Sequence, residues 1–131
     1  MSEKKENKKL NIILLIVLGI LIVAIVVTLV ILRNVNTKNR RAFNAEMQAI
    51  CEEHSVSISE DGTQYTVKIP ASTWDALSDD SKQTFCDVVA SDITTCAWSH
   101  HIIEEPFLPI VFFYSNDVYI AGGTAGNIEL N

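Results

Sequence analysis

The sequence predicts an α+β protein, in which an N-terminal single transmembrane helix is followed by a small two-layer αββαββ domain. We expect this domain to hold a four-stranded antiparallel sheet with two helices on one face. Three observations lead to this prediction. Residues 10–32 form an uncharged apolar run, the rest of the chain shows helical periodicity twice, and each helical segment is followed by two short strand-like segments.

The apolar run, LNIILLIVLGILIVAIVVTLVIL, is 23 residues long and carries no charge. A helix of this length measures about 34 Å, enough to cross the roughly 30 Å hydrocarbon core of a bilayer. A cleaved secretory signal has a shorter apolar region of about 7–15 residues and small residues at its cleavage site. This run instead ends in LRNVNTKNRR. We therefore expect an uncleaved signal-anchor that contacts membrane lipid through residues 10–32.

The charged residues are unevenly distributed along the chain. Residues 42–131 hold 14 acidic and 2 basic side chains, a formal charge of −12, so this part repels nucleic acid and no nucleic-acid partner is expected. The other eight basic residues flank the apolar run. The changes in charge and hydropathy along the sequence divide the chain into a basic N-terminal tail (1–9), the transmembrane helix (10–32), a basic juxtamembrane connector (33–41) and an acidic soluble α+β domain (42–131).

Four basic residues stand on each side of the apolar run, so the positive-inside rule alone does not decide the orientation. A short tail with four lysines before a first apolar segment is the usual signal-anchor arrangement. It predicts a cytoplasmic N-terminus and an extracytoplasmic domain. The chain contains no N-x-[ST] glycosylation sequon, and we expect a single-pass protein of a bacterial plasma (inner) membrane.

The first helix–hairpin unit covers residues 39–70. Its helix is predicted by one apolar stripe at helical spacing, which ends at His54 and has Cys51 on its edge: Phe43, Met47, Ile50 and His54. Two segments of alternating polarity follow, with Asp61-Gly62 between them as the turn of a hairpin. Pro70 is expected to end the second strand, because it cannot donate a ladder hydrogen bond.

The second unit begins with a short helical turn at 73–77, for which Ser72 and Asp75 resemble a capping box. Ser78 is the expected N-cap of a main helix that ends near Ser99. Its buried stripe is predicted to consist of Phe85, Val88, Val89, Ile93 and Cys96, with Trp74 and Leu77 holding its start against the core. The strands 110–114 and 118–122 follow, joined by a turn at Asn116-Asp117, and the first of them is apolar enough to be central.

The three cysteines leave two possibilities open. If the domain is extracytoplasmic, a Cys51–Cys86 disulfide fits two antiparallel helices, since Cys51 lies near the end of the first helix and Cys86 in the first half of the second. The alternative is three unpaired core thiols. None of the cysteines forms a C-x-x-C pair, so thioredoxin-type chemistry and zinc ribbons are not indicated.

The segment AWSHHIIEEP holds the main candidates for metal ligands: His100, His101, Glu104 and Glu105. Because these residues follow the second helix, an ordinary role at its C-terminus is favoured, where imidazoles meet the last carbonyls. Antiparallel helices would put His54 at the other end of the domain. A metal bound here would therefore need a second molecule to complete about four ligands.

Catalytic chemistry is not indicated by any motif. Asp92, Cys96 and His100 share one helical stripe, but Cys96 falls on the predicted core face, where a thiol is inert. The segment GGTAGN lacks the Lys-Ser/Thr and the following helix of a phosphate loop. We therefore expect no enzyme activity and no cofactor.

The leading functional hypothesis is a single-pass membrane-anchored protein whose small acidic extracytoplasmic domain acts as a binding, interaction or structural module. Two alternatives stay open. One is a membrane-anchored domain that senses a ligand or a cation. The other is a cytoplasmic-facing domain of a membrane complex.

Overall fold

The computed structural model describes residues 2–131, and it shows an α+β chain with a long N-terminal helix. Helix α1 runs from Ser2–His54, and the chain divides into two units between Lys38 and Asn39. In the first unit, every side chain of residues 10–32 is exposed. Helix α1 is long and apolar enough to cross a membrane, by its length and composition.

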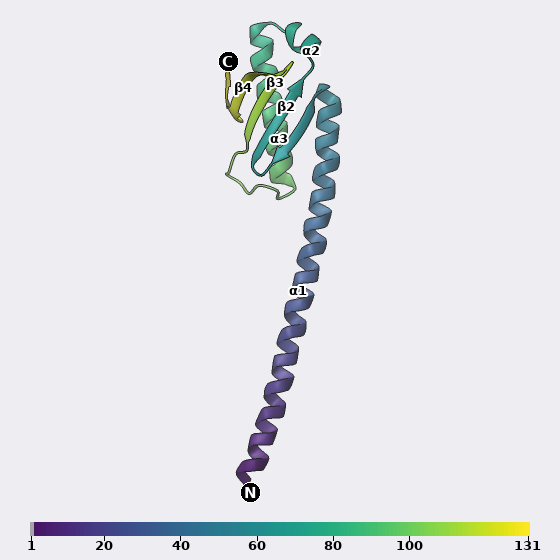
Figure 1. Ribbon diagram of the computed structural model, residues 1–131, viewed down its shortest axis with the longest axis vertical. Coiled ribbons are helices and arrows are strands. Elements are labelled where there is room, and N and C mark those ends of the chain that lie inside the picture. Colours follow the sequence, from purple (N-terminus) through teal and green to yellow (C-terminus); the bar gives the residue numbers. More distant parts are fainter. Residues whose placement is uncertain (1) are drawn as a thin grey trace. The chain divides into compact units, whose positions relative to one another are not determined.

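The second unit contains a five-stranded sheet and the remaining helices (Figure 1). The strands lie in the order of the chain: β1 (Ser57–Asp61), β2 (Gln64–Ile69), β3 (Ile110–Ser115), β4 (Val118–Thr124) and β5 (Asn127–Leu130). Helices α2 (Ala71–Asp75) and α3 (Asp79–Ser99) connect β2 to β3. Strand β3 is therefore central, as its apolar composition predicts.

The prediction of four antiparallel strands is wrong in two respects, because the sheet has five strands and is mixed. Strands β2 and β3 pair in parallel, with Val67 opposite Phe113. The physical reason is the connection: α3 carries the chain once across the sheet, so β3 starts at the same end as β2. A hairpin makes neighbouring strands antiparallel, whereas a single crossover makes them parallel.

A tight turn leads into the fifth strand, which the sequence did not predict. The GGTAGN segment ends β4 and turns at Ala125-Gly126 into β5. Gly126 has φ +85° and Gly123 has φ +145°, and a Cβ at Gly123 would collide with the backbone carbonyl of Asn127. Glycine is therefore required where β4 and β5 approach each other.

Helices α1 and α3 both pack on one face of this sheet, and Figure 1 shows the strands crossing in front of α3. The predicted stripe of α1 is confirmed, since Phe43, Met47 and Ile50 are buried against the sheet. The sheet contributes Tyr65, Val67, Ile69, Val111, Phe113, Ala121 and Ile128 to the same core. In the stripe of α3, Val89, Ile93 and Cys96 are buried, but Val88 is 43% exposed and does not belong to it.

The ends of the helices agree with the predictions in part. Ser78 caps α3, because its Oγ accepts a hydrogen bond of 3.3 Å from the backbone N–H of Ser81. The capping box at Ser72 is wrong: α2 begins at Ala71 after Pro70, and no side chain caps it. Pro70 lacks an N–H and fixes its own φ, so it both ends β2 and starts this short helix.

Candidate functional site

Two pairs of side chains cross between α1 and α3 and establish how the helices align. His100 Nε2 contacts the carboxylate of Glu46, and His54 Nε2 lies 2.8 Å from Asp92 Oδ2. The two residues on α1 are eight positions apart, and so are their partners on α3, in the opposite order. This confirms that the two helices run antiparallel.

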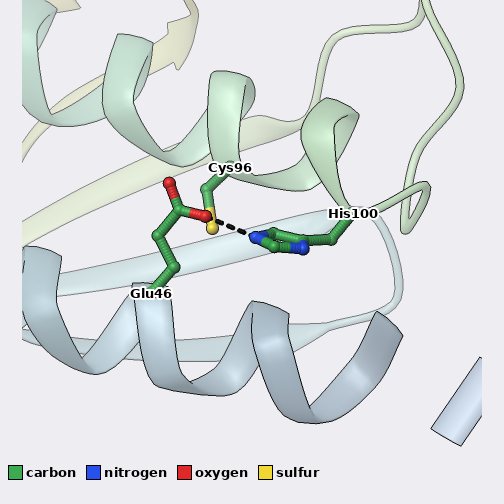
Figure 2. A group of neighbouring side chains, drawn as sticks. All are labelled: Glu46, Cys96 and His100. Carbon is green, nitrogen blue, oxygen red and sulfur yellow. Dashed lines mark hydrogen bonds and ion pairs between the residues drawn. The ribbon is translucent and has the colours of Figure 1, made fainter. Parts of the chain in front are cut away.

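The first of these pairs includes a third potential ligand, the thiol of Cys96 (Figure 2). The donor atoms of Glu46, Cys96 and His100 all lie within 4.8 Å of one another. Cys96 and His100 are one helical turn apart on α3, and Glu46 reaches them from α1, as Figure 2 shows. We call this group the thiol cluster.

The thiol cluster lies at the edge of the hydrophobic core. Cys96 is fully buried, and its Sγ is 3.9 Å from the backbone carbonyl oxygen of Phe43, at the limit of a hydrogen bond to sulfur. Burial raises the pKa of the Cys96 thiol to about 12, with a further contribution from the negative charge of Glu46. The Phe43 ring meets His100 edge-on, with 6.5 Å between the ring centroids. An isolated Cys96 is thus a neutral, unreactive thiol.

The second group consists of Glu53, His54 and Asp92, and it lacks a thiol. The ring of Phe85 packs edge-on against His54 at 6.0 Å. A surface groove of about 300 Å³ lies between the two groups, lined by Glu46, Ala49, Ile50, Glu53, Asp92 and Thr95. The α1–α3 surface therefore offers two imidazole–carboxylate groups with an acidic groove between them.

The structure separates the four residues that the sequence placed together as metal candidates. His100 turns toward α1, while His101 Nδ1 lies 3.5 Å from Glu104 Oε1 in an exposed ion pair. Glu105 is exposed and has no ion-pair partner among the described residues. Glu46, which meets His100, was missed because it is 54 residues away in the chain.

The cysteines are free thiols in the described residues, with Cys51 half-buried and Cys86 and Cys96 buried. Burial raises the pKa of Cys86 to about 12, as it does for Cys96. A Cys51–Cys86 disulfide stays a prediction for an oxidising compartment.

The face of the sheet opposite the helices carries a row of aromatic side chains. Phe112 and Tyr114 alternate with buried residues of β3 and point away from the core. Tyr119 of β4 packs against both, with ring centroids 6.3 Å from Phe112 and 5.7 Å from Tyr114. Its ring lies over Gly122, where a Cβ would collide with it. With Ile110, which is 37% exposed, these residues form what we call the aromatic sheet face.

The described residues thus contain two candidate binding surfaces, the α1–α3 surface and the aromatic sheet face. The Cys96 thiol is neutral, and His100 and His54 each contact a carboxylate. No family model, curated protein or solved structure matches the chain.

Proposed function

We propose that this protein is a single-pass membrane protein whose acidic domain lies outside the cytoplasm and binds a basic partner protein through the aromatic sheet face. In this proposal residues 1–9 are a cytoplasmic tail, 10–32 the membrane anchor, 33–41 the connector and 42–131 the binding domain. The observation that carries the membrane anchor is the exposed apolar surface of residues 10–32.

The membrane anchor is supported by the aggregation that this apolar surface would cause in water. An apolar patch of this size is an aggregation liability for a soluble protein, whereas lipid covers it without cost. Helix α1 also satisfies its own backbone hydrogen bonds, which any segment in a bilayer requires. Lipid is therefore the first partner in the proposal, and a bacterial plasma membrane is the proposed setting, in line with the absence of an N-x-[ST] sequon.

The choice of partner for the domain rests on shape and charge. The aromatic sheet face offers a flat, partly apolar platform, which is typical of interface cores rich in Tyr and Phe. Residues 42–131 carry a formal charge of −12, so two copies of the domain repel each other and a basic partner is attracted. A binding module is also the simplest function for a domain whose sequence shows no catalytic motif.

Cysteine-accessibility mapping tests the anchor and its orientation. In a Cys51→Ala background, new cysteines replace Asn7 or Ser59, both of which are exposed. A membrane-impermeant maleimide should label the position-59 cysteine in intact cells and the position-7 cysteine only after permeabilisation. The reverse pattern would place the domain in the cytoplasm, and release of the protein by alkaline carbonate would contradict the anchor.

Site-specific photo-crosslinking tests the binding face. A photoreactive residue at Ile110 samples the aromatic sheet face, and one at Ser91, exposed on α3, is the matched control. We expect position 110 to form an adduct with a protein of net positive charge, and position 91 to form none. The adduct at 110 should disappear near 1 M salt, because charges are then screened within about 3 Å. Equal adducts at both positions, or an adduct with a second copy of this chain, would contradict the proposal.

A further inference from the structure

We infer that Glu46, Cys96 and His100 form a binding site for a single divalent transition metal of the zinc type. This site lies on α1 and α3, apart from the aromatic sheet face, so it goes beyond the binding function proposed above. A metal bound there would cross-link the C-terminal end of α3 to α1.

The donor set suits this class of metal. Thiolate, imidazole and carboxylate are the three ligand types that Zn²⁺ uses in proteins, and a thiolate disfavours Mg²⁺ and Ca²⁺. Here each type is supplied once, by Cys96, His100 and Glu46. The second group, with Glu53, His54 and Asp92, has no thiol and is a weaker match.

The geometry is close to what a bound ion needs. Zinc bonds of about 2.0–2.3 Å in a tetrahedron place ligand atoms roughly 3.3–3.8 Å apart. The three donor atoms already lie within 4.8 Å of one another, on helices that the core holds together. The side chain of Glu46 is 47% exposed, so it can rotate away from His100 to admit the ion between them.

The electrostatic balance also favours a cation. Binding replaces the proton of the Cys96 thiol: the S–H bond breaks, the S–metal bond forms, and the proton leaves to solvent. One thiolate and one carboxylate then neutralise the two charges of the ion, which a site at the edge of the core requires. Three protein ligands leave a fourth position, and the acidic groove beside Glu46 gives water or a small ligand access to it.

Cobalt titration of the full chain in detergent micelles tests the site, because Co²⁺ reports thiolate ligation directly in its absorption spectrum. We expect one equivalent of Co²⁺ to produce a thiolate-to-metal charge-transfer band that Zn²⁺ displaces. At 100-fold excess over its Kd, Zn²⁺ should raise the melting temperature of the domain by roughly 10 °C or more.

Single substitutions assign the ligands. Cys96→Ser should abolish the charge-transfer band. Loss of a residue that only orients a metal ligand weakens metal binding roughly 10–100-fold. His100→Asn or Glu46→Gln should weaken Co²⁺ binding by more than this, because each removes a ligand. His101→Asn is the matched control, since its ring contacts the exposed Glu104 instead. His54→Asn is the control for the second group.

The result that would overturn the site is the absence of a thiolate band at saturating Co²⁺, or a band that persists in Cys96→Ser. Equal weakening by His101→Asn and His100→Asn would overturn it as well. Metal-free circular dichroism of each variant shows whether it folds. Should Cys96→Ser fail to fold, the surface variants Glu46→Gln and His100→Asn decide the matter, because neither changes a buried side chain.

Discussion

At the scale of single residues, Glu60 joins the first helix to the sheet through two partners. Arg40 of α1 donates two hydrogen bonds to its carboxylate, of 2.6 and 3.0 Å, and the Tyr65 hydroxyl donates a third of 2.9 Å. The Arg40 hydrogen bonds hold the pKa of Glu60 below its usual value, while burial raises the pKa of Tyr65 above its own. The Arg40 guanidinium also lies 5.3 Å from the centre of the Phe43 ring. Such bidentate pairs are the stronger kind of ion pair.

We expect Glu60→Gln to lower the free energy of unfolding of the domain by about 0.5–1.5 kcal/mol at pH 7, a value that allows for its partial exposure. Folding lowers the pKa of Glu60. The ionised carboxylate therefore makes its full contribution to the free energy of unfolding at a pH above the pKa of the unfolded state, and this contribution is lost as the pH falls through the pKa of the folded state. Chemical denaturation at pH 7 and at about pH 3 measures the difference. Glu129→Gln, exposed on β5, is the control. A penalty that stays unchanged in acid would contradict the ionic explanation.

Gly123 and Gly62 both have positive φ but differ in their surroundings. At Gly62, with φ +63°, a Cβ meets nothing within 4 Å, whereas at Gly123 it collides with the Asn127 backbone. Gly62→Ala should cost only the backbone penalty of about 1 kcal/mol, and Gly123→Ala about 3 kcal/mol or more. Thermal unfolding of the two variants compares these costs. Similar melting temperatures would mean that β5 does not approach β4 as described.

At the scale of elements, α3 organises the domain. It crosses the sheet once, which makes β2 and β3 parallel, and its other side meets α1 through the two imidazole–carboxylate pairs. Its start is fixed by Ser78 and by Trp74 of α2, which is buried and has the Lys82 ammonium 5.1 Å from its ring centre. Two acidic residues in the first turn, Asp79 and Asp80, interact favourably with the helix dipole.

The two serines near the start of α3 allow a matched test of capping. Ser78→Ala removes the side-chain acceptor for the Ser81 N–H and should destabilise the domain by about 1 kcal/mol. Ser72→Ala, inside α2 and exposed, should change stability by less than about 0.5 kcal/mol. Denaturant midpoints of the two variants make the comparison. An equal loss in both would indicate that the first helical turn depends on a capping box after all.

At the scale of the whole molecule, the apolar run and the acidic domain have opposite solvent requirements within one chain. The run has no charge over 23 residues, and the domain folds around a core of its own. A protein of this composition is expected to sit at a membrane, with the domain in water. The proposed metal site and the aromatic sheet face both lie within residues 42–131.

Charges introduced within residues 10–32 test whether this segment enters the bilayer. Leu18→Arg combined with Ile22→Arg adds about 2.5–3.5 kcal/mol per arginine to the cost of insertion. We expect a smaller membrane-bound fraction after alkaline carbonate extraction. The control, Val35→Arg with Asn36→Arg, lies in the connector and should remain as membrane-bound as the unmodified protein. Equal retention of both variants would indicate that residues 10–32 do not enter the bilayer.

The sequence by itself determined the features that depend on neighbours in the chain. These include the apolar run, the end of α1 at His54, the Ser78 cap, and the hairpin turn at Asn116-Asp117, where both residues have positive φ. Each follows from local periodicity, local hydrogen bonding or the φ preference of one or two residues. The terminal hairpin of β4 and β5 was missed because β5 is only four residues long, too short for its alternation of polar and apolar residues to stand out.

Only the tertiary structure decided the pairings between distant segments. The parallel register of β2 and β3 depends on how many times the chain crosses the sheet, and no short-range pattern records that number. The thiol cluster depends on Glu46 meeting His100 across 54 residues, through an antiparallel alignment of α1 and α3 that the shared core sets. Sequence reasoning found His100 and grouped it with its chain neighbours, whereas burial of the α3 stripe turned it toward α1. Sites built across helices are therefore determined by packing, because packing selects which faces meet.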